Sequence, residues 1–125
     1  VTTTGGASKV DITSTGAVEI KSDDTKNVVG NGLSVNAGDA VTVTGGGAGD
    51  AAAAIKGDAN ITAGGGVNVS NFTGIAVDGN LTVNSSTGVT VVGNTQRNAV
   101  RYAANITSSG AVNISNSVAL PWAAS

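Results

Sequence analysis

The stretch ANITAGGGVNVS, residues 59–70, contains the pattern on which the fold prediction depends. Two short runs in it alternate apolar and polar residues, and a glycine-rich segment separates them. The spacing is apolar, any residue, apolar, five residues, apolar, any residue, apolar. The same rule holds in five places, at Val10, Ile12, Val18 and Ile20, at Leu33, Val35, Val41 and Val43, at Ala59, Ile61, Val67 and Val69, at Leu81, Val83, Val89 and Val91, and at Ala104, Ile106, Val112 and Ile114. The chain is therefore a repeat protein.

Each half of the repeat alternates at every second residue, which is the period of a β-strand and not of an α-helix. Val, Ile and Thr dominate these runs, and their branched side chains suit strands. Gly, Asn, Ser and Asp between the halves are turn formers. Equivalent residues follow one another after 23, 26, 22 and 23 positions. Periods of about 20 to 50 residues are typical of solenoids, propellers and repeat arrays.

A third apolar position precedes each later repeat by four residues, at Val29, Ile55, Val77 and Val100. One unit therefore contains three short strands and three bends. All variation in repeat length falls between the fourth apolar position and the next repeat, where the gaps are 13, 16, 12 and 13 residues. A coil with one variable surface loop produces such a pattern.

Two all-β folds could use this pattern. A meander of hairpins needs antiparallel partners at two-residue turns and does not keep a coil period near 23 residues. We therefore predict a parallel β-helix of about five coils, with three short strands per coil and a length of about 24 Å. Stacked coils align inward ladders, Ile12-Val35-Ile61-Val83-Ile106 and Val18-Val41-Val67-Val89-Val112, and outward ladders, Glu19-Thr42-Asn68-Thr90-Asn113 and Asp11-Ser34-Asn60-Thr82-Asn105.

The chain has the size and apolar content of one domain, with 125 residues of which 40% are hydrophobic. We predict a single β-helix domain over residues 1–125, with an N-terminal edge segment at 1–9 and a C-terminal cap or docking tail at 116–125. No apolar run is long enough for a membrane span. No signal peptide is visible at Val1, so we expect that it was removed or that the chain belongs to something longer.

Composition argues against an enzyme. The chain has no Cys and no His, so it lacks thiol chemistry, disulfides, and the commonest general base and transition-metal ligand. Its six basic residues form no run and the formal net charge is −2, so we expect no nucleic-acid partner. We predict no catalytic residue, no cofactor and no metal site. Only 11% of residues are charged, which is more usual in secreted bacterial β-proteins than in cytoplasmic enzymes.

Several weaker signals have simpler explanations. Asp23 and Asp24 fall in a polar corner that reads as a solvated loop, and residues 46–50 resemble a calcium-binding nonapeptide but lack one residue and do not recur. Seven Asn-x-Ser/Thr sequons arise because Asn and Thr flank inward residues of the repeat. The outward Thr row is interrupted, which argues against ice binding. Clustered acids and bases along a groove, as a polysaccharide-cleaving β-helix needs, are absent from the sequence.

The rungs of the form Asn-Ile-Thr-x-x-Gly-x-Val-Asn-Ile/Val-Ser, at Asn60–Ser70 and Asn105–Ser115, resemble repeats of secreted bacterial β-helix adhesins. The family that these rungs resemble is the filamentous-haemagglutinin and autotransporter-passenger type, and the resemblance covers about residues 10 to 118. The resemblance implies an extracellular or cell-surface location and a structural or adhesive role. Those adhesins are usually far longer, and carry secretion or anchoring segments that this sequence lacks.

The repeat leaves the two ends of the chain unexplained. The first and last coils of a β-helix have open edges that pair with further strands unless they are capped. The N-terminal residues are uncharged and strand-like, and the C-terminal segment is apolar and holds the only Pro and the only Trp. Our predicted assembly interface is Val1, Thr2, Thr3, Leu120, Pro121 and Trp122.

We therefore expect an extracellular structural subunit that assembles end to end with other copies of itself into a fibre or surface filament. The alternative is a fragment of a bacterial surface adhesin that binds host or matrix glycan, or a host protein, through its corner loops. For that alternative the candidate ligand corner contains Arg97, Arg101 and Tyr102.

Overall fold

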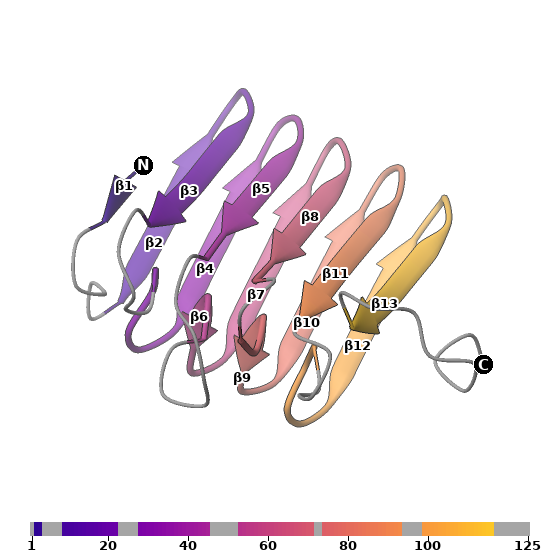
Figure 1. The fold of residues 1–125 in the computed structure, drawn as a ribbon. Helices are drawn as coiled ribbons and strands as arrows, with labels where there is room; N and C mark the ends of the chain where they lie inside the picture. Colours follow the sequence, from indigo (N-terminus) through magenta and orange to yellow (C-terminus); the bar gives the residue numbers. More distant parts are fainter. Residues whose placement is uncertain are drawn as a thin grey trace.

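The protein is a stack of short parallel strands, described here from a computed structural model (Figure 1). The structure describes residues 2–3, 9–22, 28–45, 53–71, 74–93 and 99–116. The strands are β1 (Thr2–Thr3), β2 (Val10–Ser14), β3 (Val18–Ser22), β4 (Leu33–Ala37), β5 (Val41–Thr44), β6 (Ile55–Lys56), β7 (Ala59–Ala63), β8 (Val67–Ser70), β9 (Val77–Asp78), β10 (Leu81–Ser85), β11 (Val89–Gly93), β12 (Ala104–Ser108) and β13 (Val112–Asn116). The described residues form no helix.

The strands form a parallel β-solenoid, which confirms the predicted fold class. One sheet has the order β12-β10-β7-β4-β2 and a second has the order β1-β3-β5-β8-β11-β13. Every pair of neighbours is parallel and comes from successive coils. Five strands of the first sheet enclose four crossovers, so the solenoid has about four complete turns, close to the five coils predicted.

The third strand of each coil is much shorter than the other two. It forms the two-residue strands β6 and β9, which pair with each other, and isolated bridges at Val29 and Val100. Two glycines close this pairing at the corner, because Gly32 and Gly57 have φ values of 97° and 88°, which L side chains rarely adopt. The third face is therefore a narrow corner between the two sheets.

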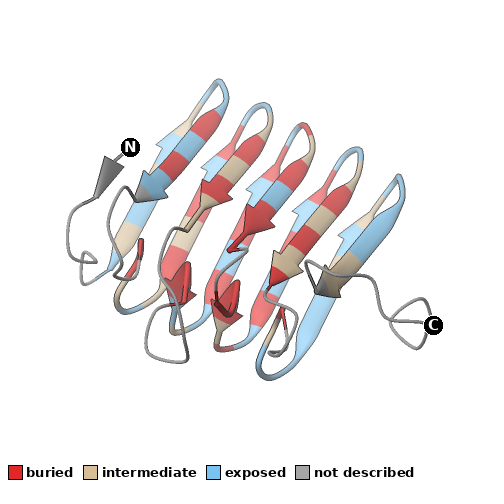
Figure 2. Cartoon of the chain, in the orientation of Figure 1, coloured by how far each residue is buried: buried red, intermediate tan, exposed pale blue. Residues whose placement is uncertain are grey.

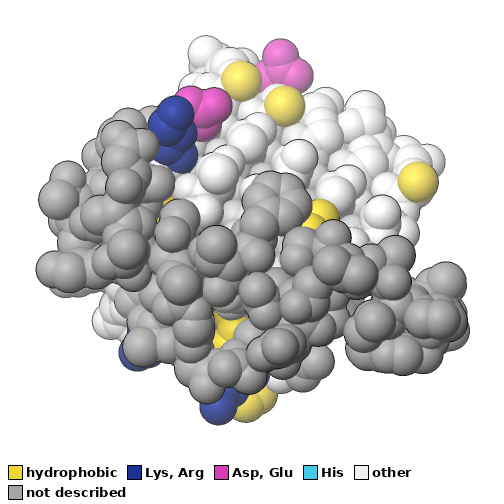
Figure 3. Space-filling model, viewed as in Figure 1, with side chains coloured by type: hydrophobic (Ala, Val, Ile, Leu, Met, Phe, Trp, Pro, Cys, Tyr) yellow, Lys and Arg dark blue, Asp and Glu magenta, His cyan; other side chains and the backbone are white. Residues whose placement is uncertain are grey.

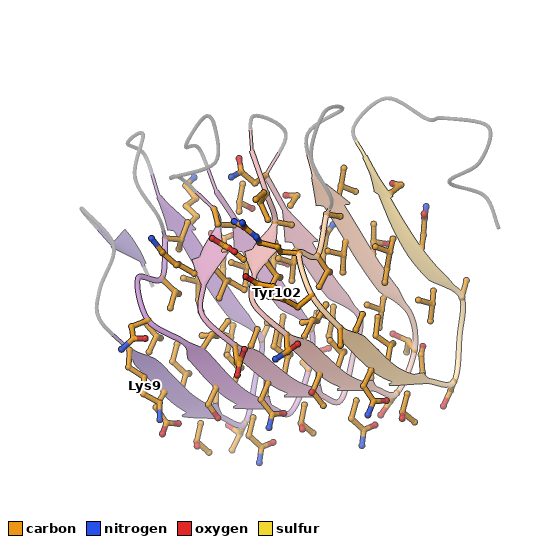
Figure 4. All side chains as sticks on the ribbon, turned by 90° about the horizontal axis from the view of Figure 1, so that it is seen from below. Lys9 and Tyr102 are labelled. Carbon is orange, nitrogen blue, oxygen red and sulfur yellow. The ribbon has the colours of Figure 1, made fainter. Side chains whose placement is uncertain are left out.

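The strand register confirms all four predicted ladders. Val35 pairs with Ile12 on one side and Ile61 on the other, and Val83 pairs with Ile61 and Ile106. In the second sheet the register runs Val18-Val41-Val67-Val89-Val112, with Glu19-Thr42-Asn68-Thr90-Asn113 on the outside. Side chains consequently stand in columns along the solenoid (Figure 4).

The core is a column of small apolar side chains between the sheets. Ile20, Val41, Val43, Ile61, Val69, Val77 and Val91 are fully buried, and Ile55 from the narrow third face closes the interior. Burial alternates along most of the inner strands (Figure 2), as in β7, where positions 59, 61 and 63 are buried and 60 and 62 are exposed. A narrow interior filled by branched and small residues explains why the chain has only three aromatic residues.

The bends between the two sheets stack so closely that some positions have no room for a side chain. A Cβ at Gly64 would overlap the backbone carbonyl of Gly38 in the preceding coil, and a Cβ at Gly110 would overlap that of Thr87. Ser85 links the bend of Gly64 to the next one, since its hydroxyl lies 2.8 Å from Gly65 O and 3.1 Å from Gly88 O and shares its one proton between them. Gly16 occupies the bend position of Gly110, but among the described residues no coil precedes its bend, and a Cβ there would have nothing within 4 Å.

We predict that Gly64→Ala destabilises the protein and that Gly16→Ala does not. The added methyl at position 64 forces stacked backbones apart, so the free energy of unfolding should fall by about 1–3 kcal/mol. Gly16→Ala makes no such contact and loses the same glycine freedom in the unfolded chain, so it should be neutral or stabilising by up to about 1 kcal/mol. Urea unfolding of both variants measures the difference, and equal losses would contradict the stacking argument.

Candidate functional site at the ends of the solenoid

The C-terminal end of the solenoid exposes side chains that every inner coil buries. Val112 is 48% exposed, whereas Val89, its equivalent one coil earlier, is 1% exposed. Ile106 and Ile114 are only partly buried and pack against the core from one side. Figure 2 shows the change, since red dominates the inner strands and is missing from β12 and β13. The last coil therefore presents an apolar surface across the solenoid axis.

The same end presents backbone donors with a defined direction. Within the solenoid, the first N–H of a strand donates to the carbonyl that precedes the equivalent strand of the next coil. Val89 N–H donates to Ala111 O at 3.0 Å, and Leu81 N–H donates to Ala103 O at 2.9 Å. The corresponding donors of the last coil are Val112 N–H and Ala104 N–H. They point to the open edge, where the described residues supply no further coil.

The N-terminal end presents the matching half of this pattern. Here β2 is the last strand of its sheet, and its inward residues Val10 and Ile12 are only partly buried. The carbonyls that correspond to Ala103 O and Ala111 O are those of Lys9 and Ala17, since each directly precedes the equivalent strand. The first coil thus has acceptors at the positions where the last coil has donors.

The outward charges distinguish the two ends. Lys9, Asp11, Glu19 and Lys21 are exposed residues of the first coil, while the strands of the last coil, ANITS and VNISN, carry no charged residue. In Figure 3 the blue and magenta side chains of the upper face lie toward the N-terminal end, and Figure 4 places Lys9 there. Charged residues on edge strands discourage indiscriminate strand pairing. The first coil has this protection and the last coil does not.

The candidate ligand corner is described only in part, because Arg97 lies outside the described residues. Arg101 follows the third-face bridge at Val100, and its Nη1 lies 3.4 Å from Asp78 Oδ1. The Arg101 guanidinium also lies 5.7 Å from the centroid of the Tyr102 ring, which is 65% exposed. Asp78 is in register with Lys56 on its other side, so the corner alternates positive, negative and positive charge.

Most of the predicted assembly interface lies outside the described residues, namely Val1, Leu120, Pro121 and Trp122. Thr2 and Thr3 are described as the strand β1, which pairs in parallel with Lys21 and Ser22 of β3. The N-terminal edge segment therefore extends one sheet by two residues, and leaves the edge of β2 without a similar cover among the described residues.

One buried polar residue, Asn71, was missed by sequence reasoning. Asn71 follows β8 at the position that Gly45 and Gly93 occupy in the adjacent coils, and it is fully buried. Its Nδ2 donates to Ile75 O at 3.2 Å across the shortest of the variable corners. The sequence signal is an Asn in a column of glycines, whereas the sequon that begins at Asn71 is attributed, like the others, to the repeat. The role of Asn71 is to satisfy backbone groups inside the solenoid.

The described residues contain no cluster of His, Cys, Asp and Glu that could hold a metal ion. Within them no helix is long and apolar enough to cross a bilayer. Shallow depressions beside the bends are lined by Gly66, Gly88 and the outward Thr and Asn rows, without a charged side chain.

Comparisons with known proteins give no family for this chain. No protein-family model matches it, and no curated protein or solved structure is significantly similar to it. The resemblance to adhesin repeats stays a prediction.

The difference in burial predicts that the same substitution has a smaller effect in the last coil than in the middle. Ile61→Ala removes a fully buried side chain and should lower the free energy of unfolding by about 2–5 kcal/mol. Ile106→Ala, in the same column, should cost less than half as much, because Ile106 is covered by a coil on one side only. Denaturation at low protein concentration compares the two variants, and an equal loss would show that the last coil is as well packed as the middle one.

Proposed function

We propose that this protein is an extracellular structural subunit that stacks end to end with copies of itself into a fibre. The observation that carries the proposal is the match between the two open ends. Val112 and strand edges that no other described strand pairs with lie at the C-terminal end, and acceptor carbonyls and the partly buried Val10 and Ile12 lie at the N-terminal end. The proposed partner is therefore a second copy of this chain.

The contact between copies is specified by the contact between coils. Because all coils share one register, β12 of one copy would pair with β2 of the next, and β13 with β3. Val112 N–H would then donate to Ala17 O of the next copy, as Val89 N–H donates to Ala111 O within the chain. Val112 would then stand opposite Val18, a residue that is already 6% exposed in the single chain, at the next position of the inward ladder.

Side-chain charge supports the same polarity. In a head-to-tail stack the carboxylates of Asp11 and Glu19 meet the amides of Asn105 and Asn113, which donate hydrogen bonds without like-charge repulsion. A head-to-tail contact of this kind is heterologous and does not close on itself, so it produces filaments. Each copy adds five rungs, or about 24 Å of length.

The extracellular part of the proposal rests on composition and resemblance. A polar surface of Asn, Thr and Ser with only 11% charged residues is more usual in secreted bacterial β-proteins. The rungs at Asn60–Ser70 and Asn105–Ser115 resemble the repeats of such proteins.

We predict that Val112→Lys weakens assembly, and that Asn113→Lys does not, because a lysine there would replace the amide opposite Glu19 with an opposite charge. Both variants gain one positive charge on β13, but only position 112 lies on the exposed apolar end, whereas Asn113 points outward. A lysine buried between two stacked copies carries a desolvation penalty, so the critical concentration for assembly should rise at least about tenfold, or about 1.4 kcal/mol. Sedimentation and electron microscopy of the full chain measure the assembly of both variants.

Two results would contradict the proposal. One is a wild-type protein that stays uniformly monomeric at high concentration in electron micrographs. The other is equal assembly of the Val112→Lys and Asn113→Lys variants, because stacking through the last coil requires them to differ. Val112 is already half exposed in the monomer, so urea unfolding should show similar stability for the two variants.

The exposed pair Arg101 and Tyr102 favours a second candidate function, glycan binding by a surface adhesin. An exposed aromatic ring beside a guanidinium offers one apolar face and several hydrogen-bond donors to a sugar.

If that second function holds, Tyr102→Ala should abolish binding on a glycan array while leaving assembly and stability unchanged. Tyr102→Phe is the matched control, because it keeps the ring and should retain most of the signal. If the wild-type protein binds no glycan on the array and forms filaments, the glycan-binding function is excluded and only the structural role remains.

A further inference from the structure

We infer that the corner of Arg101 and Tyr102 binds a neutral sugar, and that Asp58 and Asn80 contact this sugar together with the tyrosine ring. The inference rests on the second candidate function, glycan binding, and names the ligand class of that site and two further contact residues. It does not depend on stacking between copies. The observation that carries it is a pair of polar side chains, held in place on successive coils beside the exposed ring.

Asp58 and Asn80 are held in one orientation by the backbone of the next coil. Asp58 Oδ1 accepts a hydrogen bond from the N–H of Asn80 at 2.9 Å, and Asn80 Oδ1 accepts one from the N–H of Ala103 at 3.1 Å. Both residues directly precede a strand of the same sheet, β7 or β10, and the first residues of these strands pair. The two side chains therefore occupy equivalent positions, and the fold fixes the direction of one oxygen in each.

The second polar atom of each side chain has no partner in the described part of the chain. These atoms are Asp58 Oδ2, which is an acceptor, and Asn80 Nδ2, which is a donor. Both residues are exposed. Equivalent positions on neighbouring coils lie about 4.8 Å apart, so an acceptor and a donor stand side by side along the corner. A sugar hydroxyl can donate and accept, so two adjacent hydroxyls of a pyranose ring match this pair.

Tyr102 provides an apolar surface at the end of the same corner (Figure 4). It directly precedes Ala103, and its N–H donates to Gly79 O at 3.3 Å. The two preceding coils have glycines in this column, Gly57 and Gly79, and a Cβ at Gly79 would overlap the carbonyl of Gly57. The corner is thus bare backbone up to the last coil, where Tyr102 is 65% exposed. The ring can therefore pack against the C–H groups of a pyranose.

The charges of the corner favour a neutral sugar over an acidic one. Arg101 Nη1 lies 3.4 Å from Asp78 Oδ1, and Lys56 is in register with Asp78 on its other side. With Asp58 the corner has two positive and two negative side chains, so these charges cancel. The exposed acceptor of the pair is the Asp58 carboxylate, which would repel a carboxylate on the sugar. The ligand class that fits is therefore a neutral pyranose with adjacent hydroxyls.

Two substitutions change only the outward atom of each side chain. Asp58→Asn and Asn80→Asp both keep an Oδ1 that can accept the backbone N–H of the next coil, so the urea midpoint should not change. The first replaces the outward acceptor by a donor, and the second replaces the outward donor by an acceptor. The probes are methyl glucoside, methyl galactoside and methyl mannoside. We expect each substitution to weaken binding of the probe that the wild type prefers by at least about tenfold.

A matched pair of sugars tests the charge argument. The methyl uronide of the preferred sugar differs from that sugar by a carboxylate in place of the hydroxymethyl group. We expect it to bind the wild type at least about tenfold more weakly, and Asp58→Asn should reduce this difference. Saturation-transfer NMR on the full chain measures the dissociation constants, and it can be used whether or not the chain assembles.

The outcomes separate this inference from the function on which it rests. If the wild type binds none of the three methyl glycosides, the inference fails, and if it also binds no glycan on an array, glycan binding fails with it. If Tyr102→Ala abolishes binding while Asp58→Asn and Asn80→Asp bind as the wild type does, glycan binding stands and the inference is excluded. A wild type that binds the uronide at least as tightly as the neutral sugar would also overturn the inference.

Discussion

Parallel backbone pairing at one fixed register is the constraint on which the rest of the structure depends. Val18, Val41, Val67, Val89 and Val112 follow one another at the same rung position. Once two coils pair in this register, the inward, outward and bend positions of every further coil are determined. A shift by one residue would turn the apolar set of a strand to the solvent, so the alternation itself protects the register.

The same constraint limits which residues single bend positions tolerate. Bends stacked one strand spacing apart leave no space for a Cβ at Gly64, whose neighbour is the carbonyl of Gly38. Asn71 shows the opposite case, in which one larger polar residue fits between glycines because its amide meets a buried carbonyl. The many glycines of the sequence therefore do not all reflect low complexity. At positions such as Gly64 a glycine is required by the close approach of the neighbouring backbone.

The fold could be predicted from the sequence because the apolar positions repeat, and this periodicity reports the register directly. The reduced third strand could not, because Ile55, Val77 and Val100 mark inward positions without saying how many residues pair beside them. The pairing of β1 and the burial of Asn71 occur once each, so no repeat signals them. Of the candidate site, the sequence indicated the ends, but Thr2 and Thr3 lie on an edge because of their register, which their residue types do not reveal.

In a translational repeat every coil has the same two faces. The face with which coil four packs on coil five has its equivalent on coil five, where no further described coil covers it. Val112 is exposed for the reason that Val89 is buried, namely the presence or absence of one more rung. If copies stack as proposed, the solubility of a single copy depends on features that break the repeat. In this chain these are the charges Asp11 and Glu19 on the first coil and the short strand β1, and both lie at the N-terminal end. In the proposed stack the repeat itself would supply the contact between copies, and the features that oppose it would lie where the first coil departs from the pattern.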